Sequence, residues 1–460
     1  MTASFDPIMA ATRFGIGLSP HQSPPASVNQ MLQRLTGRDD AAARFPISGM
    51  DDLTPSLGDF QDANAAKRAA GGTPREDATV DAARVIRRAM STIHRTDHLA
   101  TIARGVSAAD GLRERLTHFW ADHFTVKAKN FGTHYLIAPF VQDAIRPHVV
   151  GRFSDMLKAV TFHPAMLMYL DQVSSSGPNS VFGQRTGRGL NENLARELLE
   201  LHLVGPHMDF SQTDVTELAE LLTGLQYQGR SGFAFRADRA EPGAEVVLGR
   251  RYSADATLRT IEAALEDLAT RPEVARHIAT KLAVHFVSDT PDPNLIATME
   301  SAFYDTGGDL AAVCESMLTH PLAWSPVRAK VRRPDIYMMA AWRALGITGE
   351  AIMTTPPKVY DDWIRKPMAI MAQPYLAPVG PDGWAEDPTD WITPQGLAGR
   401  INWAIGAPAV FSDPLPDPRD FVNDALGPRP PAEVVFAASA AETRADGIGI
   451  VLSAPAFQRI

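Results

Sequence analysis

The chain is poor in cysteine: Cys314 is the only one in 460 residues. A single cysteine excludes an intrachain disulfide and any zinc site that needs several thiolates. Because Cys314 lies in the apolar stretch AAVCESML, we expect a buried thiol that serves packing.

Long hydrophobic runs are also missing. No stretch reaches the roughly 18 apolar residues of a membrane-spanning helix. The N-terminal residues MTASFDPIMAATRFGIG begin with an acidic rather than a basic region and hold no apolar run of signal-peptide length before Arg13. The sequence therefore predicts no membrane span and a cytoplasmic location, unless a partner protein carries the chain out of the cell.

The sequence has no excess of positive charge either. It holds 44 basic and 53 acidic residues, a net charge of -9, and no block of Lys and Arg with interleaved aromatic residues. Because binding to nucleic acid depends on neutralising phosphates, we expect no nucleic-acid partner. The motifs Gly-x-x-x-x-Gly-Lys-Ser/Thr, Gly-x-Ser-x-Gly and His-Glu-x-x-His are absent, as is Gly-x-Gly-x-x-Gly between a strand and a helix.

Helical periodicity is the main pattern that is present. Hydrophobic residues make up 45% of the chain and charged residues 21%, which is the mix of a soluble globular protein. Helical spacing predicts helices over 79–104, 110–126, 134–147, 164–172, 191–204, 211–224, 257–287, 292–319, 329–345 and 394–405. Two strand-like runs, 231–237 and 245–252, predict one hairpin. The expected fold class is mainly α, a multi-helix globular array with at most one small β-hairpin.

Two segments interrupt this pattern in what we expect to be a single helical domain over residues 1–460. Residues 38–78 are polar and contain GRDD, SGMDD and AAGGTPRED, which predicts a loop-rich insertion. Residues 373–393 are rich in Pro and hold two Trp, which predicts a rigid loop with packed indole rings.

The densest polar motif is GLNENLARELLELH, residues 189–202. On a helical wheel Leu and Ala residues form one face, and the opposite face consists of Glu192, Asn193, Arg196, Glu197 and Glu200. Acidic and basic residues four apart are how an exposed helix is laced with ion pairs, with Asn191 as its N-cap. A solvated face and a catalytic face both remain open.

Three helical segments place a polar residue inside an apolar stripe. His202 lies in the leucine face of that helix, His123 shares a stripe with Leu and Phe residues in 112–124 while His118 points elsewhere, and Lys281 lies in the apolar stripe of 274–286. A buried imidazole needs a hydrogen-bond partner or a metal. A buried ammonium needs a carboxylate, such as Glu197 or Glu200, unless it reaches water along its methylenes.

Several segments resemble a bacterial family, the domain of unknown function 1800. RFGIGLSP, LRERLTHFWADHF, HPAMLMYLD, GLNENLARELLELHLVG, ARHIATKLAVHFV and RRPDIYMMAAWRALG follow in the family's order, and the resemblance covers essentially the whole chain. It implies no particular reaction. It implies that the family's polar motif residues are His123, Asp171, Asn191, Glu192, Asn193, Arg196, Glu197 and Lys281.

The resemblance also implies a partner and one departure. Members of the family commonly look exported and are often encoded beside a sulfatase-like companion, which implies such a companion for this chain. Where relatives show His-Asp followed by Lys, this chain has RAEPGAEVVLG, with Ala240, Glu241 and Glu245. If the family uses that His-Asp pair in catalysis, this member has altered or lost activity.

Two functions follow from these residues. In the first, the protein is an enzyme with a polar cleft between helices, in which Glu197 and His123 act as acid and base while Arg196 and Lys281 hold an anionic group of the substrate. Asn191, Asn193 and Asp171 then bind substrate, and one divalent metal on His123, His202 and Glu200 is an open alternative. In the second, the protein is a non-catalytic helical partner, and the same residues form a buried network that fixes helix packing.

Overall fold

The computed structural model describes residues 4–71, 76–129, 131–205, 208–229 and 232–460. Helices make up most of this chain, so the predicted mainly α class is confirmed. None of the described helices combines the length and the apolar character that crossing a membrane demands.

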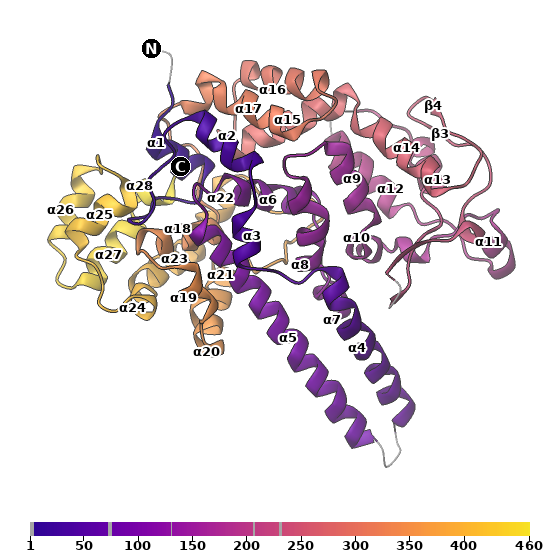
Figure 1. Cartoon of the computed structure of the whole chain (residues 1–460), viewed down its shortest axis with the longest axis horizontal. Coiled ribbons are helices and arrows are strands. Elements are labelled where there is room, and N and C mark those ends of the chain that lie inside the picture. The colour runs from indigo at the N-terminus through magenta and orange to yellow at the C-terminus, as the bar shows by residue number, and fades with distance from the viewer. Residues whose placement is uncertain (1–3, 72–75, 130, 206–207, 230–231) are drawn as a thin grey trace.

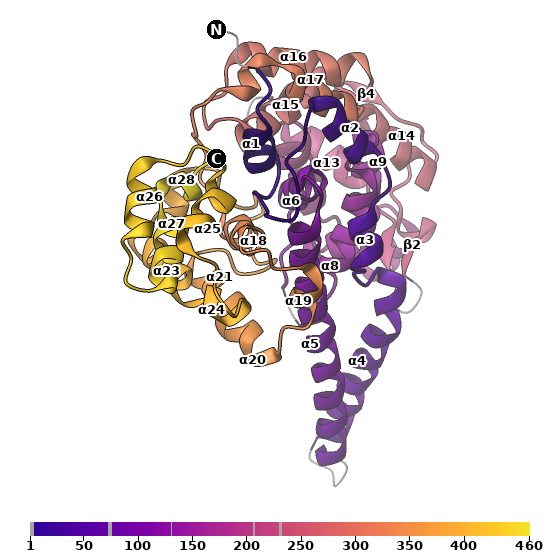
Figure 2. The same cartoon turned by 60° about the vertical axis from the view of Figure 1, so that its left-hand side comes forward.

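The N-terminal part begins in the body of the molecule and then forms a helical arm. Its elements are α1 (Pro7–Met9), the π-helix η1 (Ala10–Phe14), α2 (Val28–Thr36), α3 (Asp40–Arg44), α4 (Met50–Ala70) and α5 (Glu76–Ser107). Residues of η1 and α2 pack in the body, and α4 with the outer half of α5 forms the arm. Helices α4 and α5 pack side by side and project from the body of the molecule (Figures 1 and 2).

The arm corrects the loop-rich insertion predicted over 38–78. The described part of that range is mostly α3 and α4, and residues 72–75 lie outside the described residues. A helix that projects into solvent needs polar residues around most of its surface, so it lacks the apolar stripe by which amphipathic helices are recognised. Its Ala, Gln, Lys and Arg residues still favour helix.

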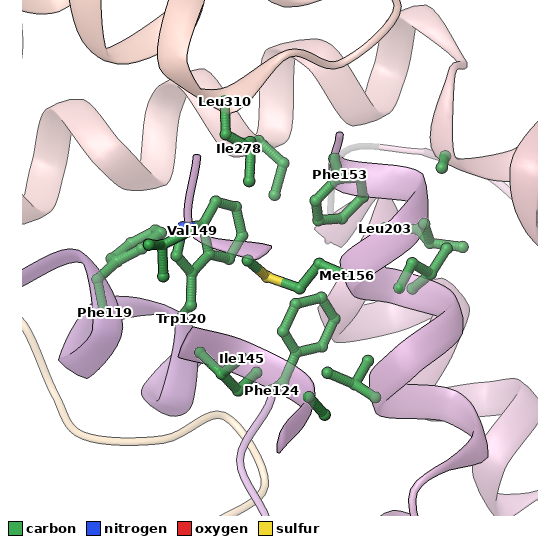
Figure 3. Packing of buried hydrophobic residues seen from close by; sticks show 14 of the residues in the cluster. Phe119, Trp120, Phe124, Ile145, Val149, Phe153, Met156, Leu203, Ile278 and Leu310 are labelled. Carbon is green, nitrogen blue, oxygen red and sulfur yellow. The ribbon is translucent and has the colours of Figure 1, made fainter. Parts of the chain in front are cut away.

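The larger body surrounds a first hydrophobic core. Its helices are α6 (Leu112–His123), α7 (Phe131–His134), α8 (Ile137–Phe140), η2 (Val141–Ile145), η3 (Arg146–His148), α9 (Phe153–Phe162), α10 (Pro164–Tyr169), η4 (Gln172–Ser174), α11 (Val181–Thr186), α12 (Asn193–Glu197), η5 (Leu198–Leu203), α13 (Gln212–Leu221), η8 (Ala237–Arg239), α14 (Leu258–Ala269), α15 (Pro272–Phe286), α16 (Pro293–Asp305), α17 (Leu310–Thr319) and η9 (Pro321–Trp324). Figure 3 shows Trp120, Phe124, Phe153 and Met156 meeting at the centre of this core, between α6 and α9.

Two small antiparallel sheets lie in this body, which corrects the single predicted hairpin. Strand β1 (Leu225–Tyr227) pairs with β2 (Phe233–Phe235), and β3 (Val246–Val247) pairs with β4 (Arg250–Arg251). Strand β2, in the run 231–237, therefore pairs with the preceding β1, whereas the run 245–252 forms a hairpin by itself. Leu248 and Gly249 both have positive φ, which makes the two-residue turn between β3 and β4 and brings these strands together at low entropic cost.

The C-terminal part surrounds a second core. Its helices are α18 (Pro334–Ala344), α19 (Gly349–Met353), α20 (Pro357–Tyr360), η10 (Asp361–Arg365), α21 (Lys366–Ile370), α22 (Pro388–Trp391), α23 (Pro394–Gly406), α24 (Pro408–Phe411), α25 (Pro418–Leu426), α26 (Ala432–Ser439), α27 (Arg444–Ser453) and α28 (Pro455–Gln458). Many begin with Pro at the first helical position, where no backbone N–H is needed. The C-terminal half of α5 packs in this second core, so α5 belongs to both the arm and the body.

Candidate functional site

The polar motif GLNENLARELLELH forms α12 and the π-helical turn η5, and its charges pair with one another. The half-exposed Arg196 guanidinium lies 3.2 Å from Glu192 and 3.5 Å from Glu200, and it also donates to Gln212 at 3.0 Å. This is the ion-pair lacing of an exposed helix, worth a few tenths of a kcal/mol per pair. The geometry therefore gives no support to Arg196 as a clamp for an anionic substrate.

The predicted substrate-binding residues hold the loop before this helix. The Asn191 side chain accepts from the N–H of Asn193 at 2.9 Å, as a helix-capping residue does, and donates to the carbonyl of Asp171 at 3.4 Å. The Asp171 carboxylate pairs with Lys129 at 2.5 Å. These contacts fix the backbone between α10 and α12.

The two predicted buried histidines are brought together. The rings of His123 and His202 lie 6.0 Å apart, and His277 lies 6.0 Å from His123. His123 donates its Nε2 hydrogen to the carbonyl of His202 at 3.0 Å, and His277 Nε2 lies 3.2 Å from the carbonyl of Leu201. The histidines thus satisfy carbonyl groups at the end of η5 that have no partner within the helix.

Burial keeps these imidazoles neutral. Burial first, and then the Lys281 charge, hold the pKa of His123 well below its usual range and lower that of His202 to about 3. Within the described residues no three His, Cys, Asp or Glu side chains are placed to share one metal ion, and Glu200 pairs with Arg196 instead. The predicted metal trio of His123, His202 and Glu200 thus has no support in the geometry.

Lys281 and Glu197 face the Pro/Trp-rich loop. Burial lowers the pKa of Lys281, and the charges of Asp122 and Glu386 oppose that shift. Lys281 is half-buried, and among the described residues it has no hydrogen bond or ion pair. Burial, and then the neighbouring Glu200 and Asp382, raise the pKa of Glu197. An ammonium and a carboxyl group without partners are therefore available beside the loop.

The segment that departs from the family pattern is an acidic cluster. Glu241 is buried and accepts two hydrogen bonds from Asn179, at 2.6 and 3.0 Å. Burial, and then Glu220 and Glu217, raise the pKa of the buried Glu245 to about 7. Ala240 packs beside them. No cation of the described chain pairs with Glu245.

The second face of α6 lines a cavity. Its apolar face lies in the first core, as predicted, whereas the residues Glu114, Thr117, His118, Ala121 and Asp122 line the cavity at helical spacing. Helices α5 and α18, η2 and the start of the Pro/Trp-rich loop form the other walls. The cavity holds about 130 Å³ and lies between the two hydrophobic cores.

His118 is oriented by a carboxylate. Its Nδ1 lies 2.9 Å from Asp335 Oδ2, at the N-terminal turn of α18. Burial raises the pKa of Asp335, but the hydrogen bond with His118 and the Arg333 charge outweigh it and lower the pKa to about 2. Asp335 accepts the Nδ1 hydrogen, and Nε2 has no hydrogen-bond partner among the described residues. This hydrogen bond therefore fixes the orientation of the His118 ring at the cavity wall.

An ion-pair network surrounds this pair. Arg333 donates to Asp122 at 2.7 Å and to Glu386 at 2.7 Å, and Glu386 also contacts His285 at 2.6 Å and Lys330 at 2.9 Å. Burial raises the pKa of Glu386, but Arg333, His285 and Lys330 outweigh it and hold the pKa well below 4.5. The network joins α6, α15, α18 and the loop.

The Pro/Trp-rich loop is fixed onto this network. The N–H of Trp384 donates to Asp122 at 2.6 Å. Gly383 has a φ of 85°, and a Cβ on it would lie 2.4 Å from Asp122 Oδ1, so only glycine permits this approach. The Trp384 and Trp391 rings lie 6.1 Å apart, and Trp391 is buried.

The acid stability of the protein should depend on Glu386. Since its pKa is lower in the folded than in the unfolded state, its stabilising contribution is complete above about pH 4.5 and is lost as the pH falls below that value. We expect the free energy of unfolding to fall more between pH 6 and pH 3 in the wild type than in Glu386→Gln. Urea denaturation at both pH values measures this, with the exposed Glu433→Gln as the control. The same loss in wild type and Glu386→Gln would contradict the assignment.

Sequence reasoning missed His118, Asp335, Arg333 and Glu386. The polar stripe of α6 looks like a solvated face, because one sequence does not show that α18 and the loop cover it. His118 and Asp335 are 217 residues apart. The one local signal is RRPD. Pro334 marks the start of a helix, which places Arg333 and Asp335 at the N-terminal end of that helix.

Comparison with known proteins identifies the family. The chain matches the family model described as "Protein of unknown function (DUF1800)" over residues 9–459, nearly its whole length. Neither the curated proteins nor the solved structures give a match. The chain therefore belongs to the DUF1800 family.

Proposed function

We propose that the protein is an enzyme that uses acid/base chemistry in the cavity between its two cores, with His118 as the general base. The observation that carries this proposal is the His118–Asp335 hydrogen bond of 2.9 Å. An imidazole whose Nδ1 hydrogen is held by a carboxylate has one tautomer and one orientation, and the carboxylate stabilises the imidazolium once a proton arrives. His118 Nε2 then takes a proton from a water, a hydroxyl or an acidic C–H group of a bound substrate.

The predicted catalytic residues take other parts in this proposal. In this proposal His123, which gives its Nε2 hydrogen to a backbone carbonyl, positions η5, and its predicted role in acid/base chemistry stays a prediction. Lys281 does not line this cavity, although its ammonium has no partner among the described residues, so its contact with an anionic group stays a prediction. Glu197, whose pKa is raised by burial, does not line the cavity either, and its role as an acid stays a prediction.

Replacing His118 by Asn should reduce turnover by about 100- to 10,000-fold, the usual contribution of a general base. The assay incubates the purified protein with a small-molecule extract of bacterial cells and follows each compound by mass spectrometry. Asp335→Asn should cause a similar loss. Replacing His21, an exposed histidine away from the cavity lining, by Asn should not. Equal rates in wild type and His118→Asn would remove His118 from the chemistry.

A second candidate is a non-catalytic partner of an exported sulfatase-like companion. The observation that favours it is the mutual pairing of Arg333, Asp122, Glu386, His285 and Lys330, since a satisfied buried network fixes packing without any substrate. A wild-type protein that changes no compound in the extract, together with co-purification of the companion, would favour this candidate. The cytoplasmic location and the export with a partner stay predictions.

A further inference from the structure

One buried cation in the cavity wall has no carboxylate partner. Arg104 of α5 is 3% exposed and lines the cavity. Its Nε donates to the carbonyl of Phe45 at 2.8 Å and its Nη1 to the amide oxygen of Gln142 at 2.9 Å. Its Nη2 is buried and has no hydrogen-bond partner. Both acceptors are neutral, whereas buried charges in proteins are as a rule paired with opposite charges.

The nearby carboxylates are engaged elsewhere. Arg146 binds Glu114 with two hydrogen bonds of 2.6 and 2.8 Å and Asp39 with two of 2.7 and 2.8 Å. Asp97, on the same helix as Arg104, accepts from Ser48 at 3.3 Å and forms no ion pair with Arg104. Burial, and then the Arg146 charge, lower the pKa of Arg104 to about 10, so it is still a cation at neutral pH.

Two buried polar atoms of the described lining have no hydrogen-bond partner, Arg104 Nη2 and the indole Nε1 of Trp342, and both are donors. A ligand group that binds to them must supply acceptors, and the Arg104 charge favours an anion. A carboxylate does both, and guanidinium groups bind carboxylates with well-defined geometry.

The rest of the lining is largely apolar. Ile102, Ile137, Phe140, Val141, Met338 and Met339 contribute to it. Methionine side chains adapt to flexible apolar ligands. A volume of about 130 Å³ has room for about ten water-sized atoms at roughly 10–15 Å³ each. These dimensions fit the chain of a medium-length carboxylic acid.

Aromatic rings lie in the same cavity wall. Tyr375 stacks on His98 with ring centroids 3.6 Å apart, and both residues line the cavity together with Arg104 and His118.

We propose that the cavity binds an amphipathic monocarboxylate of about ten non-hydrogen atoms, with its carboxylate on Arg104 and its apolar body between α5, η2 and α18. The role of this cavity as a substrate site rests on the proposed function of His118. Binding of the carboxylate can be measured without any turnover. An acyl chain or an aryl-alkyl group attached to the carboxylate are equally compatible with the lining.

Isothermal titration calorimetry with octanoate tests the proposal, because octanoate has the expected size and charge. On the wild-type protein octanoate should bind at least about 10-fold more tightly than its neutral analogue 1-octanol, and shorter and longer straight-chain carboxylates should bind more weakly. This comparison needs no variant. Weaker or equal binding of octanoate, or no binding of any of these probes, would overturn the proposal.

Arg104→Met removes the charge and keeps an apolar side chain of similar length, so it should abolish the preference for octanoate over octanol. Arg84→Met is the matched control, since Arg84 lies on the outer part of the same helix and pairs with Asp81 in solvent. Unchanged octanoate binding in Arg104→Met would place the ligand elsewhere and overturn the proposal. His118→Asn should still bind octanoate; Arg104-dependent binding with unimpaired turnover in His118→Asn would refute the proposed function alone.

Discussion

Replacing Arg333 by Ala should lower the free energy of unfolding by about 3–5 kcal/mol. The side chain is buried and is the shared partner of Asp122 and Glu386, each at 2.7 Å. Without it the partly buried carboxylates of Asp122 and Glu386 lose their strongest counter-charge, although Glu386 keeps Lys330 and His285. Asp122 loses its one ion-pair partner among the described residues, so the Pro/Trp-rich loop should also loosen.

Urea denaturation followed by circular dichroism measures the effect. The control is Arg276→Ala, which breaks an exposed pair with Glu300 of 3.2 Å and should change stability by less than about 1 kcal/mol. Limited proteolysis should cut the Arg333→Ala protein first within 373–393. Equal stability of the two variants would show that the network is hydrated in solution and does not fix the loop.

Replacing Arg146 by Met should destabilise the protein by a similar amount, about 3–5 kcal/mol. Arg146 and Glu114 are almost fully buried, with 3% and 4% of their side chains exposed. Met fills most of the volume of Arg but leaves the Glu114 carboxylate without its partner in the low-dielectric wall of the cavity. Asp39, which is 25% exposed, can be hydrated when Arg146 is lost.

The double variant Arg146→Met, Glu114→Met separates the lost ion pair from the lost packing. Removing both charges takes away the unpaired carboxylate, so the double variant should be more stable than Arg146→Met alone by about 2 kcal/mol or more. Thermal and urea denaturation of the four proteins of this cycle give the coupling energy. Simple addition of the two single effects would mean that Glu114 and Arg146 do not stabilise each other.

Local patterns predicted the helices well and the contacts between them poorly. Apolar spacing over 257–287 predicts helix throughout, and the structure has α14 and α15 there with Pro272 at the junction. The lacing of Arg196 with Glu192 and Glu200 also follows from spacing of four residues. Such features depend on neighbours in the sequence, which a single chain displays.

The cavity could not be predicted in this way. The proposed base His118 and the carboxylate of Asp335 come from α6 and α18, and Arg104 comes from α5. Neither His118 nor Arg104 is unusual in its own helix: His118 lies off the apolar stripe, and Arg104 lies near the C-terminal end of a long helix. Only packing of the two cores against each other turns these polar faces inward.

The arm described above gives the cavity a mechanical connection to the outside of the molecule. Helix α5 (Glu76–Ser107) is continuous, and at 1.5 Å per residue it is about 48 Å long. Its outer half forms the arm with α4, and its inner half carries His98, Thr101 and Arg104 into the cavity (Figure 1). Because the helix is continuous, a tilt of its outer half would move these three side chains in the cavity wall together.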